Sequence, residues 1–215
     1  MTAPLSQAIE NLYEAFEAPR PRHIDGCPCC SDRKKVRNDH KPLRELTGDD
    51  LGAYTVSLFL TVGSVVDFKY YLPRIFEIST ADEDWWPSVE IVLDKLRLGE
   101  WLKWPQFEKQ AVQTFLDSWF QERLDDTTSE IDEFNLDQRL DDLLCGLSKA
   151  GIALKPYLNR LSTYEKALKA VWHVNADTLE SRNRLSNAFW EADSKDANEV
   201  MAFLRSPEVQ AIVKA

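Results

Sequence analysis

The chain has 215 residues, of which 44% are hydrophobic and 11% aromatic, and its formal net charge is −10 at pH 7. A chain of this length and apolar content can bury a core, which excludes a disordered protein and predicts a single domain over residues 1–215. The negative charge argues against nucleic acid or an anionic membrane as the partner.

The N-terminal segment lacks the basic stretch and apolar run of a secretory signal. No stretch approaches the length of about 18 consecutive apolar residues that a membrane span needs. We therefore expect a cytoplasmic protein. Cysteines stay reduced in that compartment, so clustered cysteines favour metal binding or reactive thiols over disulfides.

The first predicted helix carries Leu5, Ile9 and Leu12 at helical spacing, which gives it one apolar face. Pro19 ends it. The polar and basic segment that follows, residues 20–42, contains three of the four cysteines. We interpret this segment as a Cys-rich loop inserted after the first helix.

Apolar residues recur at helical spacing along the rest of the chain. Thr47 or Asp49 can cap a helix that ends at Gly63, and Ser64 with Asp67 resembles a capping box for the next helix. Further helices are predicted at 89–96, 107–119 (with Phe107, Ala111, Phe115 and Trp119 on one apolar stripe), 136–147, 154–161, 164–174, 185–192, 200–204 and 206–213. No stretch alternates with period two, so the sequence predicts an all-α fold, either an irregular helical bundle or a short α-solenoid of about 8–10 helices.

The cysteines Cys27 and Cys30 have the C-x-x-C spacing, in which two thiolates can bind one zinc ion. His23, Cys29 and His40 lie in the same loop and could supply the other two ligands. If this loop binds a metal ion, the ligand set indicates a structural zinc ion; otherwise the sequence indicates no cofactor. Two alternatives stay open: the cysteines pack under a turn without metal, or they perform thiol chemistry with lowered pKa values in this basic segment.

Carboxylates cluster at residues 122–142, where nine acidic residues face two basic ones. The stretch lacks the EF-hand pattern, so it is either a solvated face or an acidic surface that docks on a basic protein. The acidic segment 81–87 adds two tryptophans, which either bind a partner or pack on the core. The candidate partner-binding residues are Asp82, Asp84, Trp85, Trp86, Asp125, Asp126, Asp132 and Glu133.

Three motifs, HIDGCPCC (23–30), KPLRELTGDDLGAY (41–54) and DFKYYLPRIFEI (67–78), resemble those of a group of soluble bacterial proteins. The resemblance extends from the N-terminus to about Trp119. It implies a bacterial cytosolic protein and assigns no catalytic residue.

The chain contains no G-x-S-x-G, P-loop or dinucleotide-binding motif, which argues against the common hydrolases, P-loop enzymes and dehydrogenases. We expect a non-enzymatic protein that binds another protein, for example an immunity protein that neutralises a basic toxin by direct binding. The alternative is a metal-dependent or thiol enzyme centred on the cluster from Cys27 to Cys30.

Overall fold

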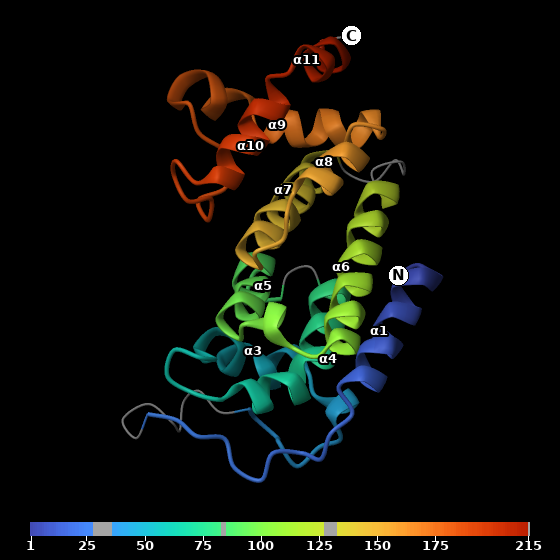
Figure 1. Cartoon of the computed structure of the whole chain (residues 1–215), viewed down its shortest axis with the longest axis vertical. Coiled ribbons are helices and arrows are strands. Elements are labelled where there is room, and N and C mark those ends of the chain that lie inside the picture. Colours follow the sequence, from blue (N-terminus) through green and yellow to red (C-terminus); the bar gives the residue numbers. More distant parts are fainter. Residues whose placement is uncertain (28–35, 83–84, 127–132, 215) are drawn as a thin grey trace. The chain divides into compact units, whose positions relative to one another are not determined.

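The computed structural model describes residues 1–27, 36–82, 85–126 and 133–214 and shows an all-α protein (Figure 1). Within these ranges there is no β-strand; isolated β-bridges pair Val62 with Gly26 and Leu58. The predicted fold class is confirmed. None of the described helices combines the length and the apolar character that crossing a membrane requires.

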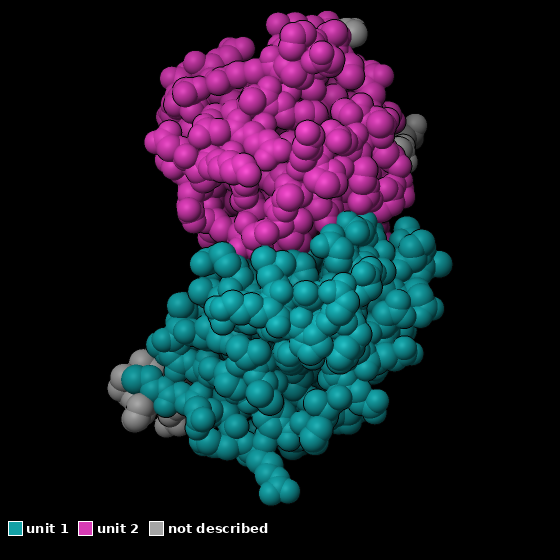
Figure 2. Space-filling view, viewed as in Figure 1, with its two compact units in different colours: residues 1–119 teal, residues 120–215 magenta. Residues whose placement is uncertain are grey.

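The chain divides into two compact units, residues 1–119 and residues 120–215 (Figure 2). The boundary falls inside helix α6 (Gln106–Asp126), which contributes to both units. Each unit buries apolar side chains of its own. The single domain expected from the chain length stays a prediction.

Unit 1 (residues 1–119) takes its framework from two helices whose first turns are capped as the sequence predicts. The Thr47 hydroxyl accepts a hydrogen bond from the Asp50 backbone amide, and the Ser64 hydroxyl accepts one from the Asp67 backbone amide. In return, each aspartate carboxylate accepts a hydrogen bond from the backbone amide of the capping residue. These capping boxes satisfy amides that a helix start leaves open. The elements of unit 1 are α1 (Ala3–Ala15), the 3-10 helix η1 (Leu43–Glu45), α3 (Gly48–Ser57), α4 (Val65–Ala81), α5 (Val89–Leu98), the 3-10 helix η2 (Trp101–Lys103) and the first part of α6.

Helix α3 ends at Ser57, so its predicted end at Gly63 is wrong. The buried ammonium of Lys95 donates to the carbonyls of Val56 at 2.9 Å and Leu58 at 3.1 Å. These bonds satisfy carbonyls that the end of a helix leaves without partners, and Phe59 then turns the chain with a positive φ of 64°. Burial lowers the pKa of Lys95 from its usual value.

The core of unit 1 is aromatic and joins α1, α3, α4 and α6. The side chains of Leu12, Tyr54 and Phe76 are each 0% exposed. Phe76 stacks on Phe115 with ring centroids 4.8 Å apart. Complete burial of one such side chain stabilises the fold by about 1.5–3 kcal/mol, so this core fixes the helices on which the surface residues stand.

Unit 2 (residues 120–215) is organised around α9, which packs against α7 and α11. Its elements are the rest of α6, α7 (Glu133–Lys149), α8 (Lys155–Leu161), α9 (Glu165–Arg182), α10 (Lys195–Leu204) and α11 (Pro207–Val213). Cys145 on α7 is completely buried, as the apolar residues around it indicate.

The helix predicted at 185–192 does not form, and residues 183–194 make turns instead. Asn183 closes α9 in the left-handed conformation, with a φ of 51°. The Ser186 amide then donates to the side chain of Asn175 at 2.8 Å, and the Asn187 side chain donates to Asp142 at 2.6 Å. These bonds hold the segment against α7 and α9 and replace the backbone bonds of a helix.

Candidate functional site

The Cys-rich loop predicted at 20–42 is attached to unit 1 at Asp25 and Cys27, in the described part that precedes residue 28. The Gly63 amide donates to the Asp25 carbonyl, and the Cys27 amide donates to the Thr61 carbonyl, both at 2.8 Å. The backbone on this side therefore pairs with the connection between α3 and α4. Cys27 itself is half-buried and its thiol is not in a disulfide.

Asp50 anchors the loop on the other side. Its backbone carbonyl accepts from the Arg37 amide at 2.9 Å. Its carboxylate, which is 4% exposed, accepts from Asn38 Nδ2 at 2.6 Å and from Lys41 Nζ at 3.2 Å. Burial alone would raise the pKa of Asp50, but the hydrogen bonds from the Thr47 backbone, Asn38 and Lys41 outweigh burial and lower it to about 2.

The predicted zinc ligands are only partly covered by the described residues. His23 and His40 are exposed, and His23 Nε2 lies 3.4 Å from an Asp25 carboxylate oxygen. Cys29 and Cys30 fall outside the described ranges. Within those ranges no three His, Cys, Asp or Glu side chains group as a metal would require. The zinc site stays a prediction, and its test is metal content.

Protein purified without added metal is expected to contain about one zinc ion per chain, because Cys27 and Cys30 need two further ligands that the same loop supplies. Cys27→Ser should abolish this content, as measured by elemental analysis. Cys145→Ala is the matched control, since Cys145 is buried on α7 of unit 2. Metal-free wild-type protein would exclude the site.

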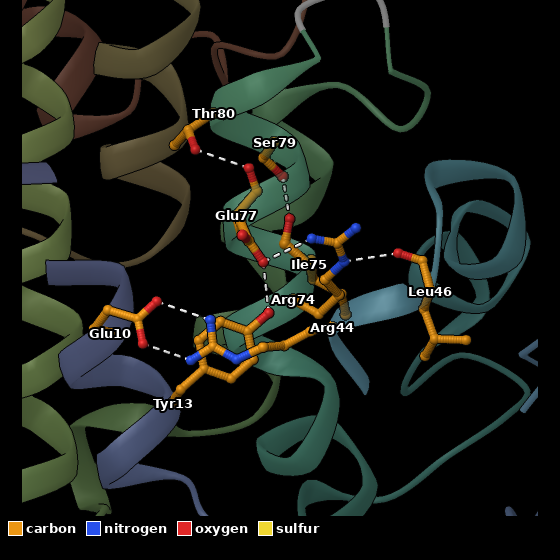
Figure 3. A network of polar contacts seen from close by, with 9 residues as sticks. All are labelled: Glu10, Tyr13, Arg44, Leu46, Arg74, Ile75, Glu77, Ser79 and Thr80. Atoms are coloured by element: carbon orange, nitrogen blue, oxygen red, sulfur yellow. Dashed lines mark hydrogen bonds and ion pairs between the residues drawn. The ribbon is translucent and has the colours of Figure 1, made fainter. Parts of the chain in front are cut away.

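A network of polar contacts fastens η1 to α1 and α4 (Figure 3). The Arg44 guanidinium donates to both carboxylate oxygens of Glu10, at 2.8 and 2.6 Å, and lies 3.6 Å from the centre of the Tyr13 ring. The Tyr13 hydroxyl donates to Glu77 at 2.6 Å. Burial, and then this bond to Glu77, raise the pKa of Tyr13 well above its usual value, so the hydroxyl stays protonated.

The same network continues along α4. Arg74 donates to Glu77 at 2.7 Å, and its Nε donates to the Leu46 carbonyl at 2.7 Å. Each charged group thus has an oppositely charged partner within the network. This arrangement suits positioning of the backbone at 43–46 better than it suits proton transfer to a substrate.

The tryptophan-bearing segment at 82–88 divides into a packed part and an exposed part. Trp85 is half-buried and its indole Nε1 donates to the Gly48 carbonyl at 3.0 Å. A Cβ atom at Gly48 would lie 2.6 Å from the indole ring, so glycine is required for this close approach. Trp86 is 62% exposed and Asp82 is exposed, whereas Asp84 lies outside the described ranges. Partner binding by these residues stays a prediction.

The acidic stretch 122–142 contains both exposed and buried carboxylates. Asp125 is exposed and accepts from Gln121 at 3.0 Å, and Asp126 lies 3.5 Å from Arg123. Asp141, in contrast, is 0% exposed, and its carboxylate accepts a hydrogen bond from the side-chain Nδ2 of Asn175. Asp132 and the side chain of Glu133 lie outside the described part. The stretch is therefore not one continuous solvated face, because Asp141 belongs to the core of unit 2.

Sequence reasoning missed a set of exposed apolar side chains in unit 1. Leu60 is 67% exposed, Val66 73%, Leu102 59% and Phe107 61%. We call these four the apolar surface residues. Phe107 begins the apolar stripe predicted on α6, but its side chain is exposed because the residue lies in the first turn of the helix, where the stripe extends beyond the core.

Unit 1 also contains a row of four aromatic rings. Successive ring centroids are 5.7 Å apart from Phe16 to Trp104, 5.9 Å from Trp104 to Phe68 and 5.5 Å from Phe68 to Phe59. Each apolar surface residue lies within three positions of one of these rings in the sequence. Phe16, Trp104 and Phe68 of this row are buried, and Phe59 is half-buried.

No protein-family model matches the chain, and no curated protein and no solved structure matches it significantly. The functional argument therefore depends on the geometry and chemistry of these surfaces.

Proposed function

We propose that this chain is a non-enzymatic interaction protein of the bacterial cytosol, which binds another protein through unit 1. The observation that carries the proposal is the exposure of the four apolar surface residues of unit 1. Exposed apolar side chains that form a contiguous patch mark interaction sites. A partner that covers them gains about 25 cal/mol for each Å² of apolar surface removed from water.

The charge supports a basic partner. With a net charge of −10, the protein attracts a positively charged protein and repels acidic ones. An immunity protein that neutralises a basic toxin by covering it needs this combination of shape and charge and needs no catalytic group. That is the concrete form of the proposal.

The test is complex formation with the purified product of the neighbouring gene, measured by isothermal titration calorimetry. Leu60→Ser and Leu102→Ser should each weaken the complex about tenfold, because each removes an apolar contact from the interface. Phe189→Ser is the control, since Phe189 is 42% exposed but belongs to unit 2. The proposal fails if no complex forms, or if all three variants bind like the wild type.

A further inference from the structure

A shallow groove of about 370 Å³ lies between α1 and α6 in unit 1. It is lined on α1 by Asn11, Glu14 and Ala15 and on α6 by Phe107, Gln110, Ala111 and Thr114. In Figure 1, α1 runs beside the part of α6 that belongs to this unit.

Both walls of the groove are helical stripes. The positions 11, 14 and 15 follow the i, i+3, i+4 spacing of one helix face, as do 107, 110 and 111. Ala15 and Ala111 have short apolar side chains, and the exposed Phe107 ring adds apolar surface to the lining. A groove of this form receives the apolar stripe of a third helix.

The charge of the groove is one-sided. Glu14 is exposed, and none of the ion pairs recorded within the described ranges involves it. The lining contains this one carboxylate and no cation, and α1 from Ala3 to Ala15 has no basic residue. A lysine or arginine of an incoming chain would therefore find an unopposed carboxylate beside an apolar floor.

The backbone of α1 and α6 decides between a helical and an extended occupant. Helical amides and carbonyls bond within their own helix, so the groove offers no open edge to which a strand could add. An amphipathic helix satisfies its own backbone groups and needs only side-chain contacts.

We infer that the groove between α1 and α6 binds a basic amphipathic helix of a protein partner. Apolar residues of that helix pack on Phe107, Ala15 and Ala111, and a lysine or arginine lies against Glu14. The inference rests on the proposed function, for which it names the kind of partner segment.

The probe is a fluorescently labelled synthetic helix of leucine and lysine, with leucine on one face. Its binding to the full chain is measured by fluorescence anisotropy, with a leucine–glutamate peptide of the same pattern as the comparison. Phe107→Ser and Glu14→Lys should each weaken binding of the leucine–lysine peptide about tenfold. Phe189→Ser and Glu180→Lys are the matched controls, since both alter exposed residues of unit 2 and should leave the affinity unchanged.

Circular dichroism should show that all four variants keep their helix content, because each changes an exposed side chain. The inference is overturned if the leucine–lysine peptide does not bind at about 1 mM, a concentration that detects an affinity of only about 4 kcal/mol. It is also overturned if the glutamate peptide binds equally, or if Phe107→Ser weakens binding no more than its control. If Leu60→Ser weakens a natural complex and Phe107→Ser does not, the groove is excluded as the binding site, while the proposed function is retained.

Discussion

Replacing Asn175 by alanine is expected to lower the free energy of unfolding by about 3 kcal/mol. Asn175 is 0% exposed, and its Nδ2 donates to Asp141 Oδ1 at 2.8 Å and to the Val171 carbonyl at 2.9 Å. Its Oδ1 accepts from the Ser186 amide at 2.8 Å. Alanine removes all three bonds and leaves a buried carboxylate and a backbone amide with fewer partners, in a region where water does not replace them.

Urea denaturation measures this loss, and Asn198→Ala provides the control. Asn198 is exposed on α10 and its side chain makes one weak bond, to the Asp193 carbonyl at 3.3 Å. Its replacement should cost no more than about 0.5 kcal/mol. Hydrogen exchange adds a local measurement, since the Ser186 amide should exchange faster in Asn175→Ala. Equal losses in the two variants would show that the Asn175 bonds do not stabilise unit 2.

The sequence predicted most of the helices, a cap at Thr47 and the capping box of Ser64 with Asp67, because these depend on residues close together in the chain. Thr47 and Asp50, for example, are three positions apart, and so are Ser64 and Asp67. Spacing of this kind is visible before any tertiary contact is known.

The failures depend on partners that are distant in the sequence. The apolar pattern at 185–192 is typical of a helix. The segment forms turns instead, because it hydrogen-bonds to Asn175 on α9 and to Asp142 on α7. The pattern at Phe107 is helical, and the helix forms, but only the tertiary packing decides which turn of the stripe is covered. Local periodicity predicts a face and does not predict what lies against it.

Asp50→Asn should cost about 2 kcal/mol at pH 7, and this cost should disappear in acid. In the folded protein the Asp50 carboxylate accepts from the Thr47 amide at 3.0 Å and from Asn38 and Lys41, which holds its pKa at about 2, below the reference value of 3.8. A carboxyl group with a lowered folded pKa stabilises the fold above its unfolded pKa. That contribution is lost as the pH falls from about 4 to about 2. The expected cost of about 2 kcal/mol is set below the free energy that corresponds to the full pKa shift, because Lys41 is partly exposed and solvent screens its charge.

The measurement is the difference in unfolding free energy between wild type and variant, from urea denaturation at pH 7 and near pH 2. Asp49→Asn is the matched control, because Asp49 is exposed in the same first turn of α3 and its replacement should change little at either pH. A difference that stays constant with pH would mean that the amide side chain disturbs packing and that charge is not the cause. If the difference disappears in acid, the Asp50 charge is what holds Asn38 and Lys41 to α3. The side-chain bonds of this second attachment would then depend on the ionised Asp50, while the bond from the Arg37 amide to the Asp50 carbonyl would remain.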